Sequence, residues 1–360
     1  MRLAEILAAH WSAYAARFGR LIPDEARAAV RAIGRCRTPA LGGQRYACAC
    51  GREHFVWHSC NHRACPRCGR DDAAAWLEHQ RARLLPVPYF LVTLTVPEEL
   101  RAPIRAAMKL WYGALLKEGA GALQDLAAQP KHLGAELGIT AVLQTWTRDL
   151  RYHPHVHLLV PGGGLTANGL RWVRVPDAQF LFPQVKLAAR FQGRLRAWLQ
   201  EEQPALLARV PTKVWWKKWV ADVQPVGSGE AALKYLAAYL CRPPLYENQL
   251  VHADAASVTF RYRENGGAAK TCTVSGSEFL RRFLQHVLPR GFQRVRHYGW
   301  QGAAAQAKRA RIHALLDWRA PTVLPPRAGA AAAVSGLRAA HAMHRPPAAR
   351  PAGAGGRMEG

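Results

Sequence analysis

Residues 152–160 read Tyr-His-Pro-His-Val-His-Leu-Leu-Val, and this stretch limits the possible folds of the chain most strongly. Successive side chains of a β-strand point to opposite faces of its sheet. His153, His155 and His157 would therefore share one face, while the residues between them point into a core. The pattern predicts a strand that is packed on one side and carries three imidazoles on the other.

That polar face has the composition of a metal site. Two imidazoles two residues apart on a strand stand roughly 7 Å apart at their Cα atoms, so His155 and His157 can converge on one cation. Residues 138–146 read as the preceding strand, and a tight hairpin would place Gln144 opposite His155. We predict that these three residues bind Mg²⁺ or Mn²⁺, with His153 as a substitute for the amide. The alternative is a solvated edge strand that happens to bear histidines.

A second chemical feature is a pair of tyrosines on a short helix, expected over residues 228–240. Tyr235 and Tyr239 stand four residues apart and so share a helix face. At about 100° per residue they point roughly 140° away from the apolar stripe of the helix. A phenolate close to a metal ion can attack phosphorus and form a covalent intermediate. Packing of the two rings against another domain is the alternative.

Six of the eight cysteines lie between residues 36 and 68. In a reducing compartment such clustering favours a metal site over disulfides. Cys65 and Cys68 form a C-x-x-C knuckle, which suits a tetrahedral structural Zn²⁺. The predicted zinc ligands are Cys48, Cys50, Cys65 and Cys68, with Cys60 as an alternative. Reduced thiols in a small core would explain the cluster without zinc.

The charge of the chain indicates its partner. Fifty Lys and Arg residues stand against 24 Asp and Glu residues, a formal net charge of +26. Such a charge favours nucleic acid, bound through its phosphates. A membrane surface is the competing partner, but no run of about 18 apolar residues could span one. The N-terminus also lacks the apolar core of a signal peptide, so we expect a cytoplasmic protein.

Particular cations are candidates for DNA contacts. Arginines interleave with the cysteines, as they do in zinc modules that bind nucleic acid. Residues 213–219 mix lysines with tryptophans, a composition that suits phosphates and stacked bases of a single strand. A buried strand with alternating tryptophans explains that stretch equally well. The expected DNA contacts are Arg63, Arg67, Arg70, Lys213, Lys217, Lys218, Lys234 and Arg242.

The remaining pattern predicts an α+β fold. Further strands are expected at residues 89–97 and 212–226, a hairpin at 257–274, and helices between them. The central strands should be antiparallel, with helices packed on the sheet and the tyrosine helix against the histidine face. Three domains are expected: a helical, zinc- and DNA-binding domain (1–85), a catalytic domain (86–304), and a basic Ala/Pro/Gly-rich tail (305–360), mostly disordered.

Four motifs together resemble a known family. They are the His-Val-His strand, the Tyr-x-x-x-Tyr helix, a Cys-rich finger beginning "CRTPALGG", and the segment "EFLRRFLQHVLPRGFQRVRHYG" at 278–299. In their order along the chain, with the Cys-rich finger first, they are similar to the two-tyrosine rolling-circle transposases of bacterial insertion sequences, the insertion-sequence ninety-one family and its common-region relatives. The resemblance spans residues 1 to 304.

The resemblance implies an HUH endonuclease core that cleaves and transfers single DNA strands at element ends and targets, in the bacterial cytoplasm near the nucleoid. His155 and His157 would hold the divalent metal, and Tyr235 or Tyr239 would attack the scissile phosphate. The products would be a 5′-phosphotyrosine and a free 3′-hydroxyl, and the second tyrosine could take the target strand. The family often has histidine where this chain has Gln144, and an amide should bind the metal more weakly.

Two other functions fit part of the sequence. "HPHVHLL" approaches the histidine-triad pattern of nucleotide hydrolases and transferases, which would leave the cysteines and the charge unexplained. A zinc-dependent nucleic-acid-binding protein without catalysis would explain the charge and the cysteines but leave the histidines and tyrosines unused.

Overall fold

The computed structural model describes residues 1–48, 51–68, 70–240, 244–263, 267–319, 321 and 343–344. They divide into two units. The larger unit comprises residues 1–34 and the described part of 61–324, and the smaller one contains residues 35–60 and the strand β13 (Met343–His344). The predicted boundaries at residues 85 and 304 stay a prediction. Most of the predicted disordered tail lies outside the described residues.

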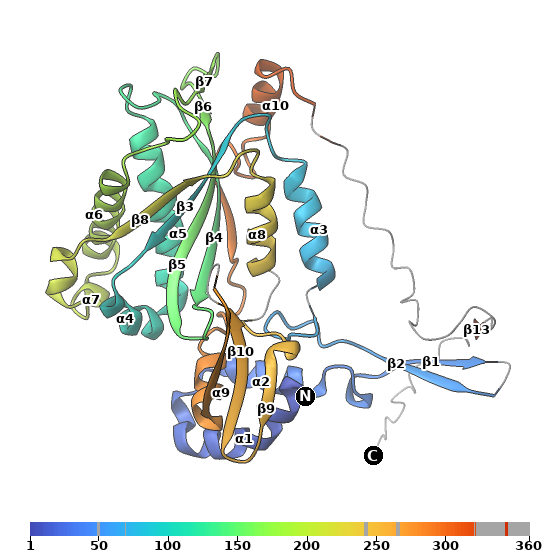
Figure 1. Cartoon of the computed structure of the whole chain (residues 1–360). Coiled ribbons are helices and arrows are strands. Elements are labelled where there is room, and N and C mark those ends of the chain that lie inside the picture. The colour runs from blue at the N-terminus through green and yellow to red at the C-terminus, as the bar shows by residue number, and fades with distance from the viewer. Residues whose placement is uncertain are drawn as a thin grey trace, which may run out of the picture. The chain divides into compact units, whose positions relative to one another are not determined.

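A five-stranded antiparallel sheet organises the larger unit (Figure 1). Its strands in spatial order are β12 (Val295–Gly299), β4 (Gly138–Trp146), β5 (Tyr152–Pro161), β3 (Tyr89–Thr95) and β8 (Val220–Pro225). Both histidine-site strands, β4 and β5, are therefore interior strands, and their hairpin pairs Gln144 with His155 as predicted. The structure confirms the α+β class with an antiparallel central sheet.

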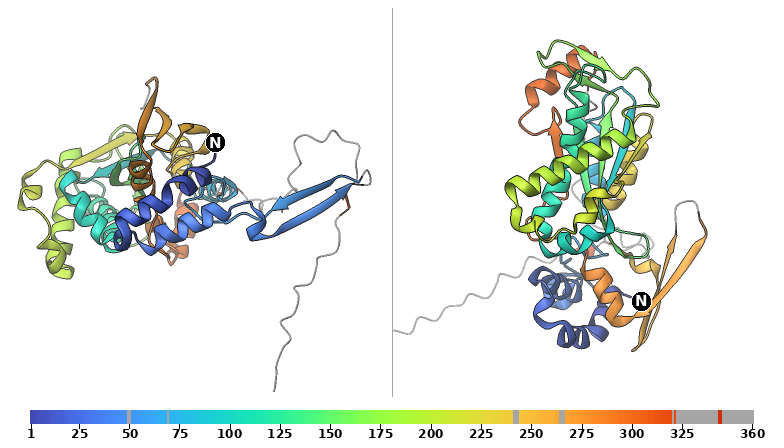
Figure 2. Two further views of the ribbon diagram at one scale, coloured as in Figure 1. Left: turned by 90° about the horizontal axis from the view of Figure 1, so that it is seen from below. Right: turned by 90° about the vertical axis from the view of Figure 1, so that its left-hand side faces the viewer.

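Helices cover both faces of this sheet (Figures 1 and 2). Val156, Leu158 and Val160 of β5 point into the larger core, which α5 and α6 complete. The opposite face of β5 carries Leu159, which packs in a second core with Leu233 of α8. The covering helices are α5 (Met108–Ala127) and α6 (Gln184–Glu202) on one face, and α3 (Arg70–Arg81), α8 (Glu230–Leu240) and α10 (Gln306–Leu315) on the other.

Segments from both ends of the sequence join at one end of the larger unit. Helix α1 (Leu3–Phe18) packs on α9 (Gly276–Leu284) so closely that a Cβ at Gly276 would overlap the imidazole of His10. Helix α9 also supports a three-stranded ribbon through an edge contact between Phe260 and Phe279. The ribbon consists of β9 (Leu250–Ala253), β10 (Ser257–Arg263) and β11 (Ala269–Ser275), which confirms the predicted hairpin.

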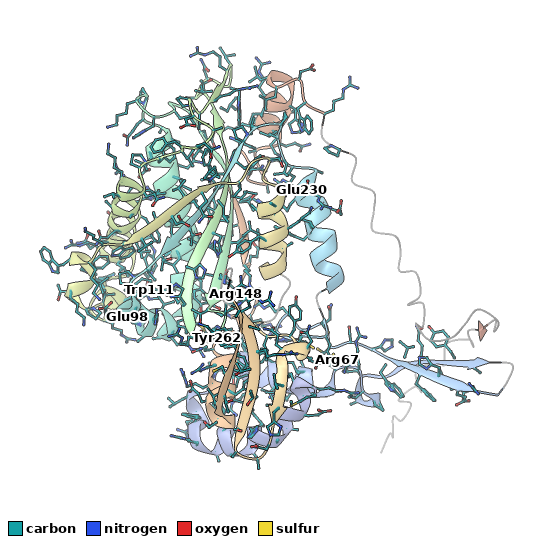
Figure 3. The ribbon with its side chains drawn as sticks, in the orientation of Figure 1. Arg67, Glu98, Trp111, Arg148, Glu230 and Tyr262 are labelled. Carbon is teal, nitrogen blue, oxygen red and sulfur yellow. The ribbon has the colours of Figure 1, made fainter. Side chains whose placement is uncertain are left out.

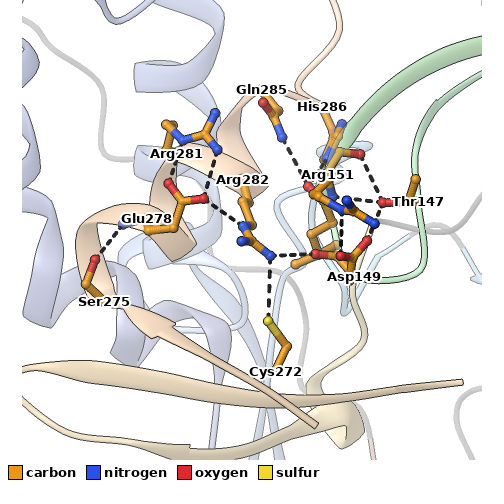
Figure 4. Close-up of polar contacts among 11 residues, drawn as sticks. Thr147, Asp149, Arg151, Cys272, Ser275, Glu278, Arg281, Arg282, Gln285 and His286 are labelled. Carbon is orange, nitrogen blue, oxygen red and sulfur yellow. Dashed lines mark hydrogen bonds and ion pairs between the residues drawn. The ribbon is translucent and has the colours of Figure 1, made fainter. Parts of the chain in front are cut away.

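Helix α9 is clamped onto the turn between β4 and β5 (Figure 4). Arg282 donates from Nη1 to the carbonyl of Asp149 at 3.1 Å, and Gln285 and His286 both donate to the carbonyl of Leu150. Ser275 caps the start of the helix, because its hydroxyl accepts from the amide of Glu278. Tertiary contacts thus fix the turn that leads into the histidine strand.

The predicted strand at 212–226 is only half correct. Residues Thr212–Trp216 form a 3₁₀ turn (η4), and the strand begins at Val220. Trp219 turns into the core, where its indole donates to the carbonyl of Val214, while Trp216 is 85% exposed. A turn held by that indole prevents the stretch from continuing as a strand.

The remaining elements are short. In the larger unit they are η1 (Gly19–Leu21), η3 (Glu98–Leu100), α4 (Arg101–Ala106), β6 (Gly163–Leu165), β7 (Trp172–Arg174), α7 (Pro204–Leu207) and η5 (Glu247–Gln249). Helix α2 (Asp24–Arg35) follows α1. In the smaller unit, η2 (Pro39–Leu41) precedes the hairpin of β1 (Gly43–Cys48) and β2 (Glu53–Trp57). Among the described residues, no helix has the length and apolarity needed to cross a membrane.

Candidate active site

The histidine face of β5 is buried beneath helix α8. His155 and His157 are only 8% and 4% exposed, and their ring centroids lie 4.8 Å apart. Because β5 is an interior strand with helices on both faces, the solvated-strand alternative is wrong. Two neutral imidazoles brought together in a dry, polar pocket need a hydrogen-bonded or metal-bound partner.

Hydrogen bonds orient both rings. His155 donates from Nδ1 to the carbonyl of His153 at 2.7 Å, which leaves the lone pair of Nε2 available. Nδ1 of His157 lies 3.0 Å from the hydroxyl of Thr93, and its Nε2 lies 2.9 Å from Oε1 of Gln144. The amide of Gln144 is itself fixed, since its nitrogen donates to the carbonyl of Trp146. Such outer contacts are what set the tautomer of a metal-binding histidine.

This donor set fits a hexacoordinate divalent cation. Two neighbouring ligands on an octahedral ion with bonds of about 2.1 Å stand about 3 Å apart, and Nε2 of His157 and Oε1 of Gln144 are 2.9 Å apart. Burial lowers the pKa of His155 to about 4 and that of His157 well below its usual value. Both rings are therefore neutral at pH 7, which is the form that binds metal.

His153 is a weaker candidate ligand than the other two. Its ring lies 5.1 Å from that of His155, but Nδ1 is 3.2 Å from the guanidinium of Arg101. The positive charge of Arg101 at that distance would repel a metal ion bound to His153. The geometry therefore favours Gln144 over His153 as the third ligand.

Helix α8 brings Tyr235 to the histidines. Its ring meets that of His157 edge to face, with centroids 5.7 Å apart, and the residue is 36% exposed. Leu233 and Leu236 of the same helix are buried in the second core, as expected for the apolar stripe of α8. The side chain of Tyr239 lies outside the described residues, so its position stays a prediction.

A cavity of about 350 Å³ opens beside this cluster. Its walls come from the end of β4, the β4–β5 turn, the start of β5, α8 and β10. Among the described residues that line it, Asp149 is the single carboxylate. The hydroxyl of Thr147 and Arg151 at 2.7 Å hold its pKa below the usual value despite its burial. The lining residues are Gln144, Trp146, Thr147, Arg148, Asp149, Arg151, His153, His155, Tyr235 and Tyr262.

Four cysteines form a second metal-type group. The sulfur atoms of Cys36, Cys60, Cys65 and Cys68 all lie within 4.8 Å of one another. Four thiolates at such separations suit one tetrahedral Zn²⁺, whose Zn–S bonds are about 2.3 Å. Of these four, Cys65 and Cys68 were predicted as zinc ligands from the sequence and Cys60 was predicted as an alternative. Cys36 was not predicted. Cys48 and Cys50 were chosen because they form a close pair; the side chain of Cys48 and all of Cys50 lie outside the described residues.

Comparison with known proteins places these features in a family. Residues 138–309 match the family model described as a putative transposase, and residues 6–96 match the transposase zinc-binding domain. The putative transposase y4qJ of Sinorhizobium fredii is 37% identical over 342 residues, which cover 89% of this chain and 85% of that protein. The chain belongs to the insertion-sequence ninety-one family of transposases.

A second relative of this transposase carries an element name. The transposase for insertion sequence element IS801 of Pseudomonas savastanoi pv. phaseolicola is 28% identical over 286 residues, covering 74% of this chain and 67% of that protein. No solved structure matches the chain. Zinc binding by the N-terminal region and action on DNA follow from the family, and the resemblance found in the sequence is confirmed.

The predicted DNA contacts of the transposase differ in whether their side chains already bind other parts of the protein. Arg63 donates to the carbonyls of Leu288, Pro289 and Phe292, which favours a structural role over the predicted contact. Lys213 and Lys217 both pair with Glu99, and Lys234 pairs with Glu230. Lys218 and the three paired lysines remain exposed. Arg67 is partly exposed, and the side chain of Arg70 and all of Arg242 lie outside the described residues.

Proposed function

We propose that this transposase cleaves single-stranded DNA and transfers the strand through a 5′-phosphotyrosine intermediate, as in rolling-circle transposition by an HUH endonuclease. One observation carries the proposal: Tyr235 lies against His157 in a cavity that His155 and Gln144 also line. A candidate nucleophile and a candidate metal site thus meet at one opening.

The residues of the site have separate roles in this reaction. His155, His157 and Gln144 would hold Mg²⁺ or Mn²⁺, which when bound polarises the scissile phosphate. The hydroxyl oxygen of Tyr235 or Tyr239 attacks phosphorus and loses its proton. The new bond joins the tyrosine oxygen to phosphorus, the bond from phosphorus to the 3′ oxygen breaks, and that oxygen takes up a proton.

The phosphotyrosine bond stores the energy of the broken phosphodiester, so rejoining needs no ATP. A 3′-hydroxyl attacks the phosphotyrosine, restores a phosphodiester and frees the tyrosine. A second tyrosine one helical turn away would allow the donor and target strands to be held in turn. The high positive charge of the chain supports binding of both through their phosphates.

The experiment that tests the proposal traps the intermediate. Single-stranded oligonucleotides carrying the ends of the protein's own element are incubated with the full chain and Mg²⁺ or Mn²⁺, and covalent adducts are resolved under denaturing conditions. Mass spectrometry of the linked peptide should identify Tyr235 or Tyr239.

The matched control is the Tyr235→Phe, Tyr239→Phe double variant, which keeps both rings and should bind DNA while forming no adduct. An adduct that survives in this variant contradicts the assignment of the nucleophiles. DNA binding without any adduct in the unaltered protein would instead support a non-catalytic, zinc-dependent binding protein. Metal-independent hydrolysis of adenosine phosphoramidates would support the histidine-triad alternative.

A further inference from the structure

Tyr262 lines the same cavity as Tyr235 but comes from a distant part of the chain. It lies on β10, whereas Tyr235 lies on α8, and the β4–β5 turn supplies Arg148 beside them (Figure 3). No role for Tyr262 was predicted from the sequence, and the proposed cleavage reaction does not use this residue. The position of Tyr262 at the opening of the cavity therefore needs a separate explanation.

The chemistry of this wall suits one unpaired nucleotide. Trp146, which also lines the cavity, is 5% exposed and already packed against Arg294 and His286. Tyr262 is partly exposed, and among the described residues its side chain makes no hydrogen bond and no aromatic contact. A partly exposed ring next to arginines is how proteins that bind single strands stack a base and hold its phosphate. About 350 Å³ falls at the small end of ligand pockets and excludes a duplex.

The position of Tyr262 is fixed by a network of contacts rather than by the strand alone. Arg282 lies 3.6 Å from the sulfur of Cys272 on β11 and also donates to the carbonyl of Asp149 in the β4–β5 turn (Figure 4). The ribbon that carries Tyr262 and the turn that carries Arg148 are thereby joined to the same helix. A wall built in this way is preorganised for its ligand.

We propose that Tyr262 stacks on the base next to the scissile phosphodiester and that Arg148 and Arg151 hold the adjoining phosphate. This subsite rests on the proposed function, since it positions the strand for attack by a tyrosine of α8. Tyr262 is a positioning residue: its ring matters and its hydroxyl does not. The ligand is one nucleotide of a single DNA strand, held outside any base pair.

The test measures base stacking apart from chemistry. Oligonucleotides with 2-aminopurine at successive positions around the cleavage site are bound to the full chain in the Tyr235→Phe, Tyr239→Phe background. We expect strong fluorescence quenching at one position next to the scissile phosphate. Tyr262→Ala should abolish that quenching and weaken binding about five- to 150-fold, the range for loss of one stacked base. Tyr262→Phe should keep both.

Two controls make the result specific. Phe180→Ala removes an exposed aromatic ring that does not line the cavity and should leave the quenching at that position unchanged. In the background with both α8 tyrosines intact, Tyr262→Phe should still form the covalent adduct. Quenching that persists in a folded Tyr262→Ala variant, or that is absent at every position in the parent protein, overturns the subsite.

The readouts also separate this proposal from the cleavage mechanism. Loss of the adduct in Tyr262→Phe with quenching retained would make Tyr262 a nucleophile and contradict the positioning role. An unaltered protein that forms no adduct but shows quenching dependent on the Tyr262 ring would refute the cleavage mechanism alone, because stacking needs no chemistry.

Discussion

The rings of His157 and Tyr235 meet edge to face at an interplanar angle of 88°, with their centroids 5.7 Å apart. This contact joins the central strand to α8, the two elements that carry the predicted metal ligands and the predicted nucleophile. The contact therefore makes the ring of Tyr235 part of the packing, in addition to the nucleophilic role that we propose for its hydroxyl.

Replacing Tyr235 should separate these two roles. Tyr235→Phe keeps the ring contact, so its free energy of unfolding should lie within about 0.5 kcal/mol of that of the parent protein. Tyr235→Ala also loses the aromatic pair and should be less stable by about 1 kcal/mol. Denaturant unfolding of the two variants measures the difference. Equal stability of the two would show that the contact with His157 does not hold α8.

Gln144 should control metal binding. Its amide oxygen lies beside Nε2 of His157, so Gln144→Ala should weaken Mn²⁺ binding roughly 10- to 100-fold. Gln144→His restores a donor and should bind Mn²⁺ at least as tightly as the parent chain. Isothermal titration calorimetry with Mn²⁺ measures both affinities. Gln224→Ala, which removes an exposed amide from β8 at the edge of the same sheet, is the control. Unchanged affinity in Gln144→Ala would remove Gln144 from the ligand set.

The zinc ligands can be distinguished by counting bound metal. Cys36→Ser removes one of four clustered sulfurs and should reduce bound zinc from about one ion per chain to nearly none. The Cys48→Ser, Cys50→Ser double variant should keep its zinc if Cys36 and Cys60 complete the site. Elemental analysis of purified full-length protein gives the stoichiometry. Zinc loss in the double variant and not in Cys36→Ser would favour the ligand set predicted from the sequence.

Arg282 should stabilise the fold more than its neighbour Arg281. Both pair with Glu278, but the side chain of Arg282 is 16% exposed and also bonds the carbonyl of Asp149, whereas that of Arg281 is 49% exposed. Arg282→Ala should cost about 2 kcal/mol of stability, since charge-assisted hydrogen bonds are lost. Arg281→Ala should cost less than about 1 kcal/mol. Denaturant unfolding compares the two, and equal costs would show that the clamp on the turn contributes little.

The buried His286 should make the protein sensitive to acid. Burial, with Arg105, Arg294 and Arg281 nearby, lowers its pKa to about 3, and the neutral ring donates to the carbonyl of Leu150. An unfolded chain takes up this proton near pH 6.5, so the contribution is fully present above pH 6.5 and is lost as the pH falls towards 3. From pH 7 to pH 5 the loss should be about 2 kcal/mol.

His286→Gln isolates this effect. A glutamine amide can also donate to Leu150 but does not titrate, so the free energy of unfolding should fall less steeply between pH 7 and pH 5 in the variant. Chemical unfolding at several pH values gives both slopes, and the other buried histidines affect both proteins alike. Equal slopes would mean that His286 is protonated in the folded protein as readily as in the unfolded chain.

Local patterns gave the central part of the site. Alternation along β5 predicted which residues face the core, and the short turn fixed the pairing of Gln144 with His155. The spacing of leucines oriented Tyr235 on its helix. These features depend on neighbours a few residues apart, where backbone geometry alone determines which side chains meet.

Local patterns failed where the partner is distant. Alternating lysines and tryptophans suggested a strand at 212–219, but burial of Trp219 turned the chain into a 3₁₀ helix. Cys36 has no cysteine close to it in sequence, so its spacing gave no signal of a ligand. Strand β12 and its pairing with β4 were not predicted, because the two strands are far apart in the sequence.

The sequence by itself determined the chemical groups of this protein: a histidine strand, a tyrosine helix, a cysteine cluster and a large positive charge. Only the tertiary structure decided that Tyr235 lies against His157, that Tyr262 borders the same cavity, and that α9 holds the β4–β5 turn. The physical reason is that backbone periodicity fixes relations within one element or hairpin. Relations between remote elements depend on how their buried side chains pack together.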